Sequence, residues 1–136
     1  MYYLTVVIDF AAAHALRGYR GKCENLHGHN WKVEVVVKGS NLDRVGMLVD
    51  FGELKAHLRE IVGELDHRNL NDLDPFLAAN PSAENIARHI FERLGAHLPA
   101  GVRIDRVTVF ETDRCGATYR QDEPTELRHV PGASTP

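Results

Sequence analysis

The sequence is poor in cysteine and has no long apolar run, and both shortages exclude classes of protein. Two cysteines, Cys23 and Cys115, are too few for a disulfide framework in a chain of 136 residues, so we expect a reducing, cytoplasmic compartment. No apolar run approaches the ~20 residues that span a bilayer, and we expect no membrane partner. The N-terminal residues lack the basic start and the cleavage site of a signal peptide.

The sequence also has no excess of positive charge. The formal net charge is −3, which argues against a nucleic-acid partner held by phosphate contacts. With 43% hydrophobic and 26% charged residues, the composition is that of an ordinary globular protein, and the length suits one domain. The unusual feature is histidine, which occurs eight times.

Apolar periodicity predicts four strands and two helices. Short apolar or alternating runs predict strands over 2–10, 31–38, 102–111 and 116–122. Apolar residues three to four positions apart predict helices over 51–65, behind a cap at Asp50, and from 80–82 to 98.

The order β-β-α-α-β-β predicts an α+β fold, with a four-stranded antiparallel sheet and both helices on one face. We expect one domain over 1–122 and an extended or disordered tail over 123–136. The opposite face of the sheet also carries valines, so we expect another subunit to pack there.

Three histidines lie close together near the N-terminus. His27 and His29 are two residues apart, so in a strand their side chains project to one side. His14 reaches the same point if the first two strands form a hairpin. Three imidazoles without a fourth protein ligand are typical of a catalytic zinc site. The alternative is that the His-Gly-His segment is a loop facing water.

Several neighbouring residues have more than one open interpretation. Cys23 is a zinc ligand, a small buried hydrophobe or a reactive thiolate. Asp66 and His67 are either a helix-end turn or a proton relay in which the carboxylate fixes the imidazole tautomer. Glu111 either ends its strand in solvent or accepts two N–H bonds from an amidine-like ligand edge.

The remaining histidines and the second cysteine need no special role. His57, His89, His97 and His129 lie on predicted helix faces or in the tail, and we interpret them as surface residues. Cys115 sits in a glycine-containing turn, where a structural role is the simpler interpretation.

Six short motifs occur in a fixed order along the chain. They are Phe10-Ala-Ala-Ala-His14, Cys23-Glu-Asn-Leu-His27-Gly-His29-Asn30, Val49-Asp50-Phe51-x-x-Leu54-Lys55, Leu65-Asp66-His67-x-x-Leu70-Asn71, Pro81-Ser-Ala-Glu84-Asn85-Ile-Ala87 and Glu111-Thr112. In this order they resemble the 6-pyruvoyl-tetrahydropterin synthase family, and within it the 6-carboxy-tetrahydropterin synthase branch. The resemblance covers about residues 3–121.

The resemblance implies a fold, a cofactor and an assembly. The fold is the tunnelling fold, in which subunits join their sheets into a barrel, commonly a homo-hexamer built as a dimer of trimers. Zn²⁺ is implied on His14, His27 and His29, and a catalytic group of Cys23, Asp66 and His67 contributed by different chains. Glu111 and Thr112 are implied to hold the pterin ring.

The branch assignment depends on the three residues between Cys23 and His27, a short spacer similar to that of the carboxy-forming enzymes. The implied substrate is 7,8-dihydroneopterin triphosphate. The implied products are 6-carboxy-tetrahydropterin, acetaldehyde and triphosphate, on the route to queuosine-type 7-deazaguanines. Arg17, Arg20 and Lys22 are candidate phosphate partners. The alternatives are a 6-pyruvoyl-tetrahydropterin synthase, which only eliminates triphosphate, and a zinc- and pterin-binding protein without turnover.

Overall fold

The computed structural model describes residues 1–19, 21 and 25–122. Three sequence predictions lie outside these residues: the role of Cys23, the phosphate contacts of Arg20 and Lys22, and the tail over 123–136. Within the described residues, no helix is long and apolar enough to cross a membrane.

Two long strands carry the first part of the chain. β1 spans Tyr2–His14 and β2 spans His27–Gly39, with 13 residues in each. They pair antiparallel, with Phe10 opposite Trp31 and His14 opposite His27. Both strands reach further toward the histidines than the apolar pattern predicted. The extra residues are small or polar, and backbone pairing keeps them extended without an apolar pattern of their own.

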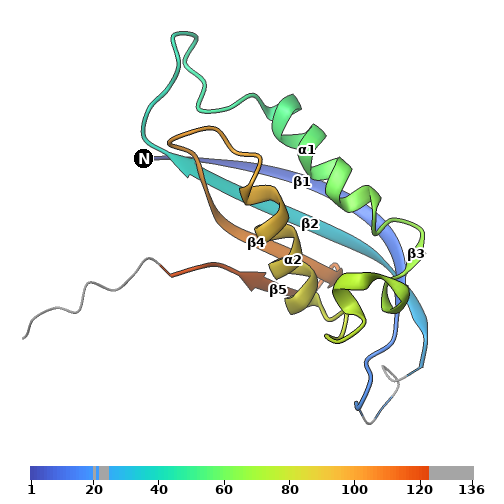
Figure 1. Cartoon of the computed structure of the whole chain (residues 1–136). Coiled ribbons are helices and arrows are strands. Elements are labelled where there is room, and N and C mark those ends of the chain that lie inside the picture. Colours follow the sequence, from blue (N-terminus) through green and yellow to red (C-terminus); the bar gives the residue numbers. More distant parts are fainter. Residues whose placement is uncertain (20, 22–24, 123–136) are drawn as a thin grey trace, which may run out of the picture.

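The sheet widens on both sides of this hairpin, as Figure 1 shows. β4 (Arg103–Thr112) pairs antiparallel with β2, and β5 (Cys115–Tyr119) pairs antiparallel with β4. The predicted α+β class with four antiparallel strands is confirmed. A fifth strand, β3 (Arg68–Asn69), pairs in parallel with β1, so the order is β3-β1-β2-β4-β5. A strand of two residues is too short to show the alternation from which strands are predicted.

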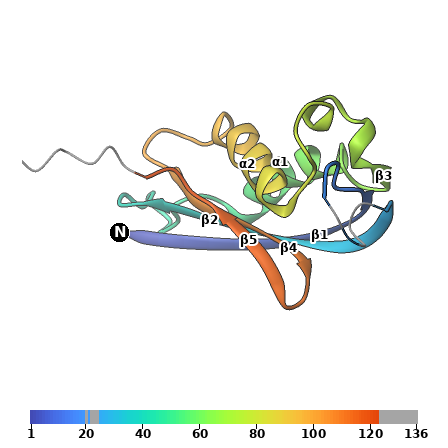
Figure 2. The ribbon, with the colours of Figure 1, turned by 90° about the horizontal axis from the view of Figure 1, so that it is seen from below.

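Both helices cover one face of the sheet, as Figure 2 shows. Their bounds are Phe51–Gly63 for α1 and Ala83–Gly95 for α2. The side chain of Asp50 accepts a hydrogen bond from the N–H of Glu53 at 3.1 Å, so the predicted cap is present. The Oγ atom of Ser82 accepts one from the N–H of Asn85 at 3.2 Å. These side chains satisfy N–H groups that the first turn of a helix leaves unpaired.

The core lies between the sheet and the two helices. Alternate residues of β1 and β2 point into it together with residues of β4, and the rings of Phe10 and Trp31 stack there with centroids 5.9 Å apart. The indole N–H of Trp31 donates to the carbonyl of Ala12 at 3.2 Å, so this buried ring leaves no unpaired donor. Because side chains alternate along a strand, residues an even number of positions from Phe10 in β1, or from Trp31 in β2, lie on this same face.

The connection from α1 to α2 wraps around one end of the sheet. It contains β3 and two short 3₁₀ helices, η2 (Leu70–Asp72) and η3 (Asp74–Phe76). Leu70 and Phe76 are buried, which anchors the connection in the core. The segment therefore has a defined path beside the ends of β1 and β2.

Candidate functional site

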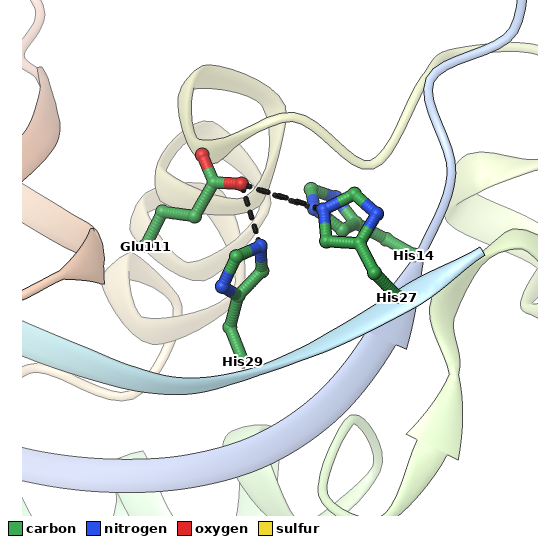
Figure 3. Close-up of side chains that lie close together, drawn as sticks. All are labelled: His14, His27, His29 and Glu111. Atoms are coloured by element: carbon green, nitrogen blue, oxygen red, sulfur yellow. Dashed lines mark hydrogen bonds and ion pairs between the residues drawn. The ribbon is translucent and has the colours of Figure 1, made fainter. Parts of the chain in front are cut away.

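Four side chains from three strands meet at one end of the sheet. His14 ends β1, His27 and His29 begin β2, and Glu111 lies near the end of β4. Figure 3 shows the three imidazoles and the carboxylate pointing toward one another. The direct pairing of His14 with His27 brings the two ends of the hairpin together. His29 follows on the same face because side chains alternate along a strand.

The four ligand atoms are close enough to share one ion. They all lie within 4.8 Å of one another. The Nε2 atoms of His14 and His27 are 3.1 Å apart. Oε1 of Glu111 lies 2.7 Å from Nε2 of His29, 3.2 Å from that of His14 and 3.8 Å from that of His27. Ligands about 2 Å from one tetrahedral metal ion are roughly 3.3 Å from one another, so the spacing suits a shared metal ion.

Backbone carbonyls fix the tautomers of two of the rings. Nδ1 of His14 lies 2.7 Å from the carbonyl oxygen of Pro81, and Nδ1 of His27 lies 2.7 Å from that of Asn25. A carbonyl only accepts hydrogen bonds, so each Nδ1 carries the proton and each Nε2 presents a lone pair. Two lone pairs facing each other at 3.1 Å repel unless a proton or a metal ion lies between them. The cluster is therefore built to hold a positive charge.

His29 adds a third available nitrogen. Among the described residues, its buried Nε2 atom has no hydrogen-bond partner, although it lies within ion-pair distance of Glu111. Burial lowers the pKa of His29, an effect that the carboxylate of Glu111 opposes and that His14 and His27 reinforce. A lowered pKa favours the neutral ring, which is the form that binds a metal. Three imidazoles are the donor set of several catalytic zinc sites.

Asp66 and His67 form a second group at the edge of β1. Nδ1 of His67 lies 2.9 Å from Oδ1 of Asp66, and the same oxygen accepts the N–H of Ala11 at 2.9 Å. The N–H of His67 donates to the carbonyl of Ala11 at 2.6 Å. His67 has a φ of 57°, a left-handed conformation that is uncommon outside glycine. These contacts hold the strained residue where β3 begins.

The electrostatics of this pair favour an ionised aspartate. The N–H of Ala11, and then the hydrogen bond with His67, keep the pKa of Asp66 below its ordinary range. The imidazole of His67 is 81% exposed, so it is open to a ligand or to another chain. Within the described residues, no hydrogen bond or ion pair joins this pair to the histidine cluster. His67 and His29 nevertheless line one shallow groove, whose floor includes the alanines of β1.

The other residues that the sequence singled out have different surroundings. Thr112 is exposed, and its Oγ1 accepts the N–H of Arg114 at 3.3 Å within the turn between β4 and β5. Cys115 is exposed and lines a small cavity together with His14 and Glu111, a position that its turn sequence did not predict. Arg17 is not arranged as a phosphate partner, because its guanidinium donates to the carbonyls of Phe76, Leu77 and Ala79.

His89 departs from its interpretation as a surface residue. It lies on α2 with its Nε2 atom buried, and its ring makes an edge contact with Phe76 at 5.7 Å. Burial lowers its pKa, and Arg93 reinforces that effect. Helical periodicity placed His89 outside the main apolar stripe of α2. The connection between the helices covers it, and only the tertiary structure shows that.

The fold and the site together define a class of protein: a small α+β domain with a three-histidine cluster at one end of an antiparallel sheet. The chain belongs to the 6-pyruvoyl tetrahydropterin synthase family, whose sequence profile matches residues 3–122. It is similar to the solved structure of Caenorhabditis elegans 6-pyruvoyl tetrahydropterin synthase, with a TM-score of 0.79 and 30% identity, covering 89% of this chain and 96% of that one.

Curated relatives carry more than one name. A 6-carboxy-5,6,7,8-tetrahydropterin synthase of Synechocystis sp. is 40% identical over 117 residues, covering 82% of this chain and 87% of the relative. A dihydroneopterin monophosphate aldolase of Pyrococcus furiosus is 41% identical over 108 residues, covering 79% of this chain and 88% of the relative. The names share pterin chemistry and differ in the reaction.

Proposed function

We propose that this chain is a cytoplasmic, Zn²⁺-dependent 6-carboxy-5,6,7,8-tetrahydropterin synthase of queuosine-type biosynthesis. Its substrate would be 7,8-dihydroneopterin triphosphate, converted with water into 6-carboxy-tetrahydropterin, acetaldehyde and triphosphate. The observation that carries the proposal is the convergence of three imidazole nitrogens at the end of the sheet, two of them with their tautomers set by backbone carbonyls. Membership of a pterin synthase family supplies the class of substrate.

His14, His27 and His29 would hold the metal. A zinc ion bound there supplies Lewis acidity toward oxygen atoms of the substrate side chain. Nδ1–H of His14 and of His27 donates to a carbonyl, and this orients each ring and raises its basicity as a ligand. Burial of His29 disfavours its protonated form, so the ring is kept available as a ligand.

His67 is the proposed proton carrier. The ionised carboxylate of Asp66 favours a proton on Nδ1 of His67, which leaves Nε2 to exchange protons with side-chain oxygens of the substrate. The two hydrogen bonds with Ala11 hold both residues at the strand edge. Cys23, the proposed base toward the side-chain carbon, lies outside the described residues.

Glu111 is proposed to hold the pterin ring by accepting N–H bonds from its amidine-like edge. Its side chain is 30% exposed and faces the cluster. The carboxylate lies at the metal site, so a pterin that it binds presents its side chain close to the three imidazoles. Thr112 is proposed as a neighbouring contact of the ring.

The proposed assembly is a homo-hexamer made of two trimers, with each active site shared between chains. Two edges of the sheet support it. In the part of the chain that the structure describes, β3 pairs with Ala12 and Ala13 alone, so the earlier part of β1 forms one edge, and β5 forms the other. Such edges are open to pairing with another chain.

Product analysis tests the reaction. Zinc-loaded protein is incubated with 7,8-dihydroneopterin triphosphate, and the products are identified by mass spectrometry. Release of acetaldehyde with a 6-carboxy product is the expected result. Triphosphate release without acetaldehyde would instead identify a 6-pyruvoyl-forming enzyme. A phosphorylated two-carbon aldehyde would identify an aldol cleavage, and an unchanged substrate would identify a binding protein.

A mixing experiment tests the shared site. His27→Ala and Asp66→Asn are each expected to be inactive on their own. If a site takes its histidine cluster from one chain and its Asp66–His67 pair from another, hexamers refolded from both variants contain some complete sites. Partial recovery of turnover is therefore expected. Mixed hexamers that remain inactive would place both groups of each site in one chain.

A further inference from the structure

The carbonyl of Pro81 is the partner that orients His14. The two residues are 67 positions apart in the chain, and the hydrogen bond between them is buried. His14 itself is 1% exposed, so its ring has no alternative contact with solvent. Any displacement of the Pro81 carbonyl would therefore turn or release the ring and move its Nε2 atom in the cluster.

Asn80 holds the residue before Pro81 against the end of β1. Its Oδ1 accepts the N–H of Arg17 at 3.0 Å, and its Nδ2 donates to the carbonyl of Arg17 at 2.9 Å. This pair of bonds has the pattern that joins two strands. The carbonyl of Asn80 in turn accepts Nδ2–H of Asn85 at 2.8 Å. Asn80 thus connects the segment after His14 to the first turn of α2.

The side chain of Arg17 also links the segment after His14 to the residues that precede Asn80. Its guanidinium donates to the carbonyls of Leu77, at 2.6 Å, and of Phe76. Nearer to His14, Asn71 makes a similar pair of bonds with Ala15, each of 2.8 Å. The residues that follow His14 are therefore bound at several points to the segment that supplies Pro81.

We propose that Asn80 and Arg17 are positioning residues of the metal site. They hold the Pro81 carbonyl against Nδ1 of His14, and so they set the direction of Nε2 and the affinity of the site for zinc. This role gives a function to the Pro81–Asn85 motif and to the residue before it. The proposed reaction assigns no other role to that motif. The inference rests on the proposed metal site. Neither residue belongs to the cluster that would hold the ion, so their effect is exerted through His14.

The zinc affinity of the Asn80→Ala variant tests the positioning role of Asn80. Metal-free protein is titrated with Zn²⁺ in competition with a chromophoric chelator, and Co²⁺ is added separately to record its visible absorption. We expect a dissociation constant for zinc that is roughly 10–100-fold higher, in line with losses from outer-shell partners of metal ligands. The Co²⁺ bands are expected to change in position or intensity. Asn80→Asp keeps the Oδ1 acceptor and is expected to lose less affinity for zinc.

Two controls separate positioning from general stability. Asp50→Ala removes the side-chain cap of α1 and leaves the contacts of Asn80 intact, so its zinc affinity should match that of the native chain. Urea unfolding in chelator measures the stability of each metal-free variant. If Asn80→Ala does not fold, Arg17→Lys replaces it, since a lysine keeps the charge and loses the fork of donors.

The outcomes discriminate between the hypotheses. Zinc affinity within twofold of the native value and an unchanged Co²⁺ spectrum would overturn the positioning role alone. An equal loss in Asp50→Ala would also overturn it, because the effect would then follow stability. A native protein that takes up no zinc would refute the proposed metal site, and the inference would be refuted with it.

Discussion

Nδ1 of His67 lies 2.9 Å from Oδ1 of Asp66, and the same oxygen accepts the backbone N–H of Ala11. The relationship joins a candidate proton carrier to the edge of the sheet through a single carboxylate. It also explains how His67 is held in a left-handed conformation, since its own N–H is bonded to Ala11 as well. The predictions below begin from this pair.

Asp66→Asn should reduce kcat strongly with little effect on zinc content. An amide has no charge to favour the required tautomer of His67, so we expect a loss of roughly 10²–10⁴-fold, the range for general acid–base catalysis. Product formation measured at saturating substrate checks this. The far-UV circular dichroism spectrum and zinc content serve as controls. Turnover close to the native rate would remove the pair from the mechanism.

Glu111→Gln should weaken pterin binding and leave the zinc stoichiometry unchanged. An amide keeps the size of the side chain, but it cannot accept two N–H bonds from the ring edge as a carboxylate does. Fluorescence titration with a pterin and elemental analysis of the purified protein measure the two properties separately. Loss of zinc with unchanged pterin affinity would assign Glu111 to the metal instead.

His27→Ala should abolish stabilisation of the fold by zinc. A ligand that binds only the folded state at 100 times its dissociation constant adds about 2.7 kcal/mol to the free energy of unfolding. The native protein should therefore show a rise of that order when zinc is added and a loss when a chelator is added. His27→Ala should show neither. Urea unfolding with and without zinc provides the measurement, and His97→Ala, at an exposed histidine, is the matched control.

His89 should make the fold less stable in acid. Burial lowers its pKa in the folded state, so below the ordinary histidine value of about 6.5 the unfolded chain takes up the proton more readily. The contribution of His89 is thus fully present above pH 6.5 and is lost as the pH falls toward its folded-state pKa. His89→Leu should show a shallower fall in the free energy of unfolding between pH 8 and pH 5.

The same substitution should leave the fold as stable or raise its stability at pH 8. Leucine removes a buried ring nitrogen that has no hydrogen-bond partner among the described residues, a group worth about 1 kcal/mol or more in lost solvation. Urea unfolding of metal-free protein at several pH values measures both effects, with His97→Leu as the exposed control. Parallel pH profiles for the native chain and His89→Leu would contradict the prediction.

The local patterns of the chain predicted most of the fold. The alternating valines of β2 and the apolar stripes of the helices depend on neighbours within the same element, as does the cap at Asp50. Motif order was enough to identify the family, and parity along β2 placed His27 and His29 on one side of the strand. These features follow from residue spacing and backbone geometry alone.

Other features could not be predicted because they depend on long-range contacts. β3 exists only because Arg68 and Asn69 lie beside β1, and the burial of His89 depends on the connection around Phe76. Charge and proximity suggested that Arg17 binds phosphate. Its donors instead bond to carbonyls some 60 residues away, a partner choice that no local pattern records.

The sequence by itself determined which residues have the chemistry for the site: imidazoles two positions apart, an Asp–His pair and a glutamate at a strand end. The tertiary structure decided which of them meet. Antiparallel pairing sets His14 opposite His27, and β4 brings Glu111 across 97 positions to His14. The reason is physical. Spacing within one element fixes only the face on which a side chain lies, whereas a metal site needs atoms from several strands within a few ångströms, which only sheet register and core packing provide.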